Sequence, residues 1–277
     1  MITLFKWMSV SPLWLLHGLG WMLGWLAFGL SPTYRRRFLA NVDQAGLNWH
    51  QWRPSVGQSG KLVAELPRLW MGAPVPVQWS EQALERVRQA LESGRGLVFL
   101  TPHLGCFEVT AQAYAQQFGV RWPMTVLFRP ARKPWLREVV AQSRQRPGLL
   151  AAPTTLAGVK LLLKALKAGH AVGLLPDQVP PAGQGVMAPF FGRPAYTMTL
   201  SVRLIQQTGA AVLLAWGERL SWGRGYRLHV APLRADLPAD VGLAVAAINL
   251  EMQALVQQCP GQYLWGYARY KAPRSES

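Results

Sequence analysis

The sequence is poor in cysteine and in acidic side chains. Its two cysteines, Cys106 and Cys259, lie far apart, so the spacing indicates neither a disulfide framework nor a metal-thiolate cluster, and a reducing compartment is expected. Among the 277 residues, 13 Asp and Glu stand against 29 Lys and Arg, which leaves a net charge of +16. Because the basic residues are spread through the chain, they indicate anionic substrates or an anionic surface as partners.

Signatures of several other protein classes are absent. The sequence has no zinc-finger spacing, no RNA-binding aromatic motif and no basic recognition helix, which argues against a nucleic-acid partner. It has no repeat, low-complexity segment or long linker, and with 50% hydrophobic residues it can bury the core of one large domain, alone or with an appendage. The 13 tryptophans favour lipid, because indole rings prefer the boundary between membrane and water.

A single long apolar run covers residues 13–30, in which His17 is the only ionisable side chain. Its 18 residues just reach the length that spans a bilayer. A lysine at position 6 precedes the run and three arginines follow at positions 35–37, so the positive-inside tendency places the carboxy-terminal bulk in the cytoplasm. His17 is expected to be packed or interfacial, not a ligand.

Tryptophans recur along this amino-terminal segment. Trp7, Trp14 and Trp21 are spaced by seven residues and Trp25 follows four later, which indicates an aromatic stripe on a helix that packs or lies at the membrane interface. A cleaved signal peptide is disfavoured, because no small-residue cleavage site follows the run and the arginines lie on the wrong side for export. A buried core helix is the remaining alternative.

Beyond residue 80, strand and helix patterns alternate, whereas residues 38–80 carry a mixed pattern that assigns no element. The predicted strands are residues 96–101, 124–128, 149–152, 171–175, 211–216 and 226–230. The predicted helices are residues 81–93, 109–118, 135–144, 156–168, 199–207 and 241–258. This alternation predicts an α/β fold with a mixed, largely parallel central sheet flanked by helices, with any antiparallel strands toward the carboxy terminus.

The most informative segment is residues 96–108, where a strand ends at Pro102 and His103 and Glu108 follow on a turn into a helix. Five residues advance an ideal helix by about 500°, so Gly105 indicates that His103 precedes the helix and folds back over its first turn. Such a pair suits general-base catalysis, in which Glu108 orients the imidazole and His103 takes a proton from an alcohol. The alternative is a helix cap and a surface charge.

Two further polar residues, Arg129 and Asp177, follow predicted strands and should therefore share a rim of the sheet with His103. A guanidinium donates a forked pair of hydrogen bonds to a phosphate or a developing oxyanion. Alternatively, Arg129 and Asp177 form structural ion pairs, for instance with each other. Cys106 lies inside the catalytic segment, but a buried neutral thiol is a better reading of it than a nucleophile.

These residues carry a resemblance that spans nearly the whole chain. The blocks, in order, are His103 with Glu108, Phe128-Arg129-Pro130, Pro176-Asp177-Gln178 followed by residues 188–195 (APFFGRPA), and Pro260 to Trp265 with Arg269 and Lys271. A histidine and an acid at this spacing are a weak signal alone, whereas four blocks in order are strong. The sequence resembles the late lipid A biosynthesis acyltransferases, the lauroyl and myristoyl transferases of Gram-negative bacteria, within the lysophospholipid acyltransferase superfamily.

The resemblance implies a reaction. His103 and Glu108 would deprotonate a hydroxyl of a glycolipid acceptor, which then attacks an acyl thioester. Arg129 would bind a phosphate or the thioester oxyanion, and Asp177 would be structural or orient the acceptor. The residues that it implies for substrate binding are Arg129, Asp177, Gln178 and Arg193.

The same resemblance implies a glycerolipid acyltransferase-like fold, in which residues 1–30 form a membrane-anchoring helix and residues 31–277 the acyltransferase catalytic domain. The donor would be an acyl carrier protein or acyl-CoA, both of which suit a basic protein. No cofactor and no metal are implied. The protein would be held at the bacterial inner membrane, with membrane lipids as partners and its catalytic domain on the cytoplasmic face.

Two departures from the family pattern put the acceptor in doubt. The family commonly has Asn-Trp where this chain has Cys106-Phe107, and the terminal basic pair is reduced to Ala268-Arg269. Acylation of a lysophospholipid or an aminolipid is therefore the alternative activity. A catalytically inactive membrane scaffold is a further alternative, against which the intact His103 and Glu108 argue.

Overall fold

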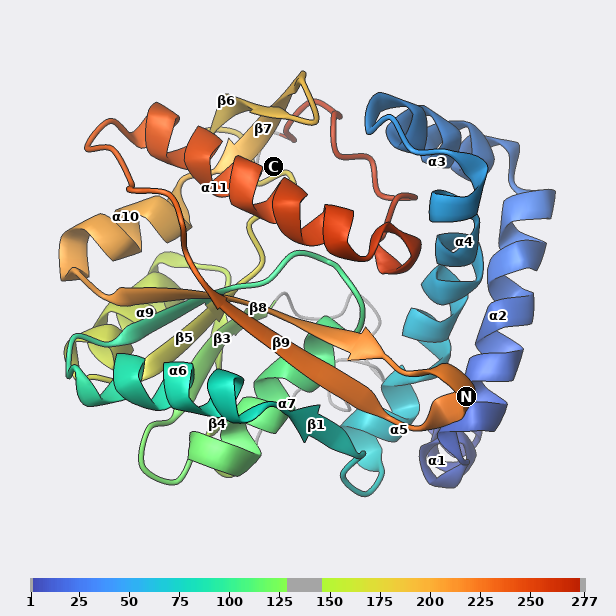
Figure 1. The fold of residues 1–277 in the computed structure, drawn as a ribbon, viewed down its shortest axis with the longest axis horizontal. Coiled ribbons are helices and arrows are strands. Elements are labelled where there is room, and N and C mark those ends of the chain that lie inside the picture. The colour runs from blue at the N-terminus through green and yellow to red at the C-terminus, as the bar shows by residue number, and fades with distance from the viewer. Residues whose placement is uncertain (1, 129–145, 275–277) are drawn as a thin grey trace.

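The computed structural model describes residues 2–128 and 146–274, with a seven-stranded sheet at its centre (Figure 1). The strands, in spatial order, are β1 (Val77–Trp79), β9 (Tyr226–Pro232), β8 (Ala211–Arg219), β2 (Leu97–Leu100), β5 (Ala171–Leu174), β3 (Met124–Phe128) and β4 (Leu149–Pro153). From β8 to β4 all neighbours are parallel, whereas β9 is antiparallel to β8 and parallel to β1. The predicted mixed, largely parallel α/β sheet is confirmed.

Helices cover both faces of this sheet (Figure 1). One face carries α6 (Glu81–Glu92) and α7 (Phe107–Phe118), and the other carries α9 (Leu156–Lys167), α10 (Leu200–Thr208) and α11 (Val241–Gln258). In β2, Leu97 and Phe99 join the first layer while Val98 and Leu100 join the second, because successive strand side chains point to opposite faces. A strand that is apolar at every position is typical of a parallel sheet covered on both sides.

A two-stranded antiparallel hairpin, β6 (Gly185–Phe190) and β7 (Arg193–Met198), stands apart from the main sheet and packs against α11 (Figure 1). The side-chain amide of Asn249 on α11 donates a hydrogen bond to the Pro189 carbonyl over 2.9 Å. The sequence pattern did not predict this hairpin, because Pro189 and Pro194 interrupt both strands.

Five helices form the amino-terminal part. They are α1 (Ile2–Val10), α2 (Leu13–Leu30), α3 (Pro32–Gln44), α4 (Trp49–Ala64) and α5 (Leu66–Met71). Within the described residues, α2 is the one helix whose length and composition would allow it to cross a membrane. Ser11 and Pro12 separate α1 from α2, so the predicted tryptophan stripe is divided, with Trp7 on α1 and the later tryptophans on α2.

A buried ionic cluster joins α2 to the sheet. Glu65, between α4 and α5, accepts hydrogen bonds from the Arg219 guanidinium at 2.6 and 2.9 Å and from the Tyr226 hydroxyl at 2.8 Å, and it lies 3.1 Å from His17 Nε2. Burial opposes ionisation of Glu65, but the charge and hydrogen bonds of Arg219, aided by His17, lower its pKa to about 2. The cluster therefore holds α2, the end of β8 and the start of β9 in one arrangement.

Candidate active site

The turn between β2 and α7 carries His103 and is fixed by its backbone on both sides. The Gly105 N–H donates to the Gln262 carbonyl over 3.0 Å, and the Cys106 N–H donates to the Gly217 carbonyl over 2.7 Å. Gly105 has a φ of +60°, and a Cβ there would collide with the Gly217 carbonyl, so a glycine is required. The turn is thus pinned between β8 and the carboxy-terminal segment.

The adjacency of β2 and β5 brings His103 to Asp177. Leu100 is in register with Leu174 at the ends of these parallel strands, and both site residues lie three positions further along. His103 Nδ1 is 2.7 Å from Asp177 Oδ1, and the His103 backbone N–H donates to Asp177 Oδ2 over 2.8 Å. Burial raises the pKa of Asp177, but the charge and hydrogen bonds of His103 outweigh it, so the pKa lies below its ordinary value and the carboxyl is ionised.

The other ring nitrogen of His103 faces an amide. The Gln178 side-chain amide lies 2.9 Å from Nε2, and the Phe107 ring lies 4.9 Å from the imidazole between centroids. In the neutral imidazole, an ionised Asp177 accepts the Nδ1 proton, so Nε2 carries the lone pair and the Gln178 amide donates to it. Nε2 is therefore the atom that can take a proton from a substrate.

The carboxylate at Nδ1 is Asp177, which occupies the position that the sequence analysis gave to Glu108. Asp177 and Gln178, which the resemblance implies for substrate binding, both contact the imidazole, and their binding of substrate remains a prediction. Glu108 is the second residue of α7 and is half-buried, and its catalytic role remains a prediction. The local spacing suggested Glu108, whereas the contact with Asp177 arises from strand pairing, which the spacing does not encode.

The other residues that the sequence singled out lie as follows. Arg129 and the predicted helix at residues 135–144 lie outside the described residues. Arg193 is exposed at the start of β7, where its guanidinium lies 4.7 Å from the centre of the Tyr270 ring. Burial, and then the negative charge of Glu65, raise the pKa of the Cys106 thiol well above its ordinary value, which argues against a thiolate nucleophile.

Two functional neighbours were missed, Tyr263 and Arg269. The buried Tyr263 hydroxyl donates to Asp177 Oδ2 over 3.2 Å, and the positive charge of buried Arg269 helps to lower the pKa of Asp177. Arg269 is fixed by donating to the Tyr196 carbonyl over 2.8 Å. Both lie in the carboxy-terminal block that carries the family resemblance, but no local pattern indicates that this block reaches Asp177.

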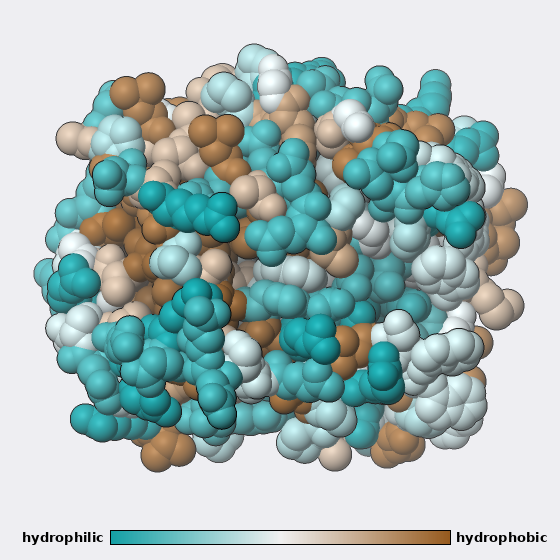
Figure 2. Space-filling view, viewed as in Figure 1, coloured by the Kyte–Doolittle hydropathy of each residue, from teal (hydrophilic) through white to brown (hydrophobic). Residues whose placement is uncertain are grey.

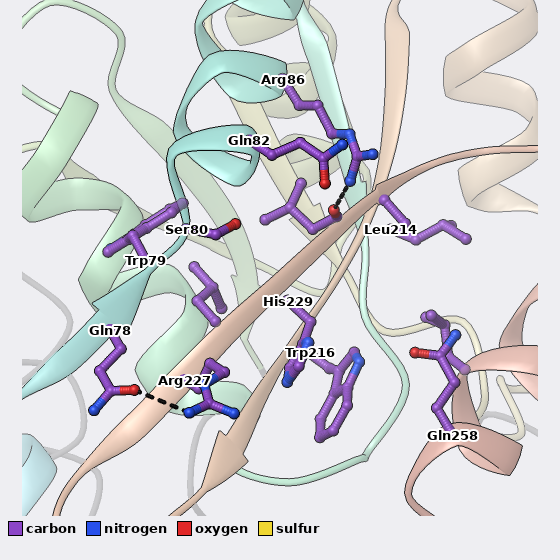
Figure 3. Close-up of a pocket in the computed structure, with 14 residues that line it drawn as sticks. Gln78, Trp79, Ser80, Gln82, Arg86, Leu214, Trp216, Arg227, His229 and Gln258 are labelled. Atoms are coloured by element: carbon purple, nitrogen blue, oxygen red, sulfur yellow. Dashed lines mark hydrogen bonds between the residues drawn. The ribbon is translucent and has the colours of Figure 1, made fainter.

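A cavity of about 430 Å³ lies elsewhere, between α6, α11 and the strands β8 and β9 (Figure 3). Trp216 and His229 stack in it with ring centroids 4.4 Å apart, and Arg86 and Arg227 point toward it. None of the residues that line it was predicted to be in the site. The cavity lining includes none of His103, Asp177 and Gln178, and we take the rim that holds these three residues as the candidate active site.

Taken together, the fold and the rim define an α/β protein in which a carboxylate orients a histidine at the edge of the sheet, an arrangement suited to group transfer to a hydroxyl. Residues 53–272 match the family of bacterial lipid A biosynthesis acyltransferases. The chain belongs to this family and is an acyltransferase of lipid A biosynthesis.

Curated relatives agree with this assignment. The chain is 27% identical over 211 residues to the lipid A biosynthesis palmitoleoyltransferase of Escherichia coli, a match that covers 75% of this chain and 67% of that protein. It is 28% identical over 200 residues to the lipid A biosynthesis lauroyltransferase of the same organism, with coverage of 70% and 62%. A lipid A biosynthesis acyltransferase of Haemophilus influenzae is 28% identical over 185 residues, with coverage of 66% and 56%. The match thus spans between 56% and 67% of these relatives.

Proposed function

We propose that this protein is a membrane-bound O-acyltransferase that moves a fatty acyl chain from an acyl thioester to a hydroxyl of a lipid A precursor or related glycolipid. The observation that carries the proposal is the hydrogen bond from His103 Nδ1 to the ionised Asp177. It fixes the tautomer in which Nε2 is a proton acceptor at the carboxyl rim of a largely parallel sheet, where active sites of such folds lie.

In the proposed reaction, the acceptor hydroxyl takes the place of the Gln178 amide and donates its proton to His103 Nε2. The hydroxyl oxygen forms a bond to the thioester carbonyl carbon, which gives a tetrahedral oxyanion and an imidazolium held by Asp177. The oxyanion collapses, the carbon–sulfur bond breaks, and the leaving thiolate takes the proton from Nε2. The products are the acyl ester and a free thiol, and the histidine returns to its starting state.

The remaining site residues have proposed roles at the substrates. Glu108 is proposed to assist the base from the first turn of α7, and Arg129 to bind an acceptor phosphate or the oxyanion. Arg193 is proposed to bind the acceptor, which its exposure on the hairpin allows. The donor is proposed to be an acyl carrier protein or acyl-CoA, since both carry negative charge and the chain carries +16.

We place the catalytic domain at the cytoplasmic face of the inner membrane. The apolar helix α2 supports attachment to a membrane, and the arginines at positions 35–37 support the cytoplasmic side, because the lipids of the cytoplasmic leaflet are anionic. The family membership supports a bacterial glycolipid as acceptor.

One observation favours a different acceptor, such as a lysophospholipid or an aminolipid. Phe107 occupies the position at which the family commonly has Trp, and its ring contacts the imidazole of His103. A smaller ring at this position changes the space in which the acceptor hydroxyl must approach Nε2.

Lipid mass spectrometry of a strain that lacks the gene separates these acceptors. We expect the lipid A fraction to lose the mass of one acyl chain, and we expect wild-type protein, but not His103→Ala, to restore it. A normal lipid A fraction together with a missing acyl chain in phospholipids or aminolipids would replace the first acceptor by the second. Unchanged lipids of every class would contradict the enzymatic proposal.

A further inference from the structure

Exposed apolar side chains from three segments form one surface at the α2 edge of the molecule. Figure 2 shows hydrophobic side chains projecting along the edge at which Figure 1 places α2. The large apolar side chains that are exposed on α1, on α2 and on the 3-10 turn η1 (Ser221–Gly223) are Leu4, Trp7, Val10, Trp14, Leu19, Trp21, Met22, Leu23, Leu26, Leu30 and Trp222. The η1 turn joins β8 to β9 and packs against the start of α2, where Gly223, next to Trp222, lies against the backbone of Trp14.

The opposite side of α2 packs against α4 and against Glu65, the residue that follows α4. His17 meets Glu65, a Cβ on Gly20 would lie 2.6 Å from the Lys61 Cα, and Phe28 lies 6.3 Å from Trp52 between ring centroids. As the residue number rises on α2 it falls on its partners, so the two helices are antiparallel neighbours, as Figure 1 shows. The helix α2 therefore cannot change its tilt without α4.

The polar content of α4 excludes a spanning orientation for the pair. The helix carries Arg53 and Lys61, and it leads into the buried Glu65 and Arg219. If α2 crossed the bilayer, α4 would cross beside it, and each charge brought into the hydrocarbon core costs about 2.5 kcal/mol or more. Separation of α2 from α4 would instead leave Glu65 without His17 and would expose the side of α4 that contacts α2, which includes Trp52 and Val56.

We propose that α2 lies in the plane of an anionic bilayer surface, with one side packed on α4 and the other in the lipid interface, and that Trp222 inserts beside it. Charge complementarity supports this partner: the first 42 residues contain Lys6 and three arginines at positions 35–37 but no acidic residue. The inference rests on and refines the membrane attachment of the proposed function, and it adds a contact from the turn between β8 and β9.

The conformation of Trp222 supports its part in this surface. Its side chain is 88% exposed, and its backbone is left-handed, with φ +60° and ψ +26°, which is unfavourable for a bulky residue. An indole that is this exposed, on a strained turn, gains little from packing against the protein core. In a lipid interface, the same indole buries its apolar body while its N–H stays hydrated.

Depth-dependent fluorescence quenching tests the orientation. Trp14→Cys, Met22→Cys and Leu30→Cys, which lie at the two ends and the middle of α2, are each labelled with an environment-sensitive dye. The native cysteines should react little with the dye, since Cys106 is buried and burial raises the pKa of Cys259 to about 11. The proteins are bound to phosphatidylethanolamine–phosphatidylglycerol vesicles that carry quenchers at shallow or deep acyl positions.

An in-plane helix predicts the same shallow depth at all three positions, within about 5–10 Å of the headgroup boundary. A spanning helix of about 27 Å predicts that the Met22 label alone is quenched best by the deep quencher, and that result would overturn the proposal. The quenching measurement uses neither acyl donor nor acceptor. The orientation of α2 can therefore be confirmed or overturned independently of the proposed acyltransferase activity.

Trp222→Asn tests the added contact, because asparagine tolerates the left-handed conformation. Vesicle binding should weaken about threefold to tenfold, since binding strength scales with the apolar area buried in the interface. The control is Leu243→Ala at the start of α11, which Figure 1 places on the side opposite α2 and which should bind as wild type does. If Trp222→Asn folds poorly, the alternative is a dye attached to Trp222→Cys, which should report the same shallow depth as the labels on α2. The role of Trp222 is overturned if that dye reports an aqueous environment, or if Trp222→Asn binds vesicles as wild type does.

Discussion

His103 is held at its two ring nitrogens by consecutive residues, Asp177 and Gln178, which follow the strand next to its own. The Asp177 carboxylate accepts three hydrogen bonds, two from His103 and one from the Tyr263 hydroxyl. Because both oxygens are engaged, a residue with one acceptor oxygen cannot replace Asp177 without placing an amide donor against an N–H or O–H donor. In the proposed mechanism, Asp177 is therefore the residue that positions the base.

Asp177→Asn should therefore lower kcat about 100-fold or more, with KM for the acceptor changed much less, because the imidazole loses its tautomer control and the stabilisation of its charged form. Steady-state acyl transfer by the purified variant, with circular dichroism as a check on folding, measures the effect.

Tyr263→Phe is the matched control for that experiment. It removes only the 3.2 Å hydrogen bond to Asp177 Oδ2 and leaves both bonds between Asp177 and His103, so kcat should fall by less than about tenfold. If Asp177→Asn were as active as Tyr263→Phe, the assignment of Asp177 as the positioning residue would be wrong, and Glu108 would regain that role.

At the scale of elements, the packing of α2 on α4 depends on glycines at their contact. A Cβ on Gly24 would collide with the Val56 carbonyl of α4, whereas a Cβ on Gly29 of the same helix would meet nothing within 4 Å. Gly24→Ala should lower the free energy of unfolding by about 1–3 kcal/mol through overpacking.

Gly29→Ala should be neutral or raise that free energy by up to about 1 kcal/mol, since alanine is the better helix former. Urea unfolding of the detergent-solubilised proteins, followed by tryptophan fluorescence, compares the two variants. Equal effects would show that α2 does not pack on α4 in solution.

The buried Glu65 makes stability depend on pH. Its pKa is lowered from 4.5 to about 2 in the folded protein, so its contribution is fully present above pH 4.5 and is lost as the pH falls toward about 2. A shift of this size corresponds to about 3 kcal/mol. Glu65→Gln should flatten the stability profile across that range, and at neutral pH it should lower the free energy of unfolding by about 3–5 kcal/mol, because Arg219 is left buried without its partner.

Glu218→Gln, on β8 next to Arg219, provides the comparison with Glu65→Gln. Glu218 is partly exposed and pairs with His229 at 2.8 Å and with the exposed Arg227 at 3.8 Å, so its replacement should lower the free energy of unfolding by less than about 1 kcal/mol. Stability curves of the two variants between pH 2 and pH 7 that could not be told apart would contradict the role given to Glu65.

The same elements show what a sequence pattern can predict. The strands β2, β3 and β5 and the helices α9 and α11 were predicted within a residue or two, since each is a continuous apolar run or a clear helical period bounded by turn residues. The hairpin of β6 and β7 was missed because of its prolines. The helices α3 to α5 were missed because their apolar positions also contact one another and α2, which blurs the period.

For the site, the sequence predicted that His103 and Asp177 lie on the same rim of the sheet, but not that their side chains pair. His103 and Asp177 each follow a strand, so their common location was expected, and β2 and β5 confirm it. That Asp177 reaches Nδ1 follows from the two strands being immediate neighbours in register, which no single segment encodes. Glu65 was overlooked although it is the sole acid between Asp43 and Glu81, because its partners lie more than 150 residues away at Arg219 and Tyr226.

At the scale of the whole molecule, the packing of α2 bears on the predicted division into residues 1–30 and 31–277. Leu16, His17 and Gly20 are buried against the rest of the chain. We therefore expect a chain that lacks residues 1–30 to fold poorly and to aggregate, because the side of α4 that contacts α2 and the Glu65 cluster would both become exposed. Expression of that truncation as a soluble monomer with cooperative unfolding would show instead that residues 1–30 are a dispensable anchor.

The most direct test of the central claim is acyl transfer by the purified full chain and by His103→Ala. Each is incubated with a lipid A precursor and an acyl thioester, supplied as acyl-acyl carrier protein or as acyl-CoA, and the products are followed by mass spectrometry. We predict that the wild-type protein adds the mass of one acyl chain in ester linkage, and that His103→Ala, folded and membrane-bound as before, is slower by about 10²- to 10⁴-fold. A variant that keeps more than about a tenth of the wild-type rate would contradict the assignment of His103 as the base.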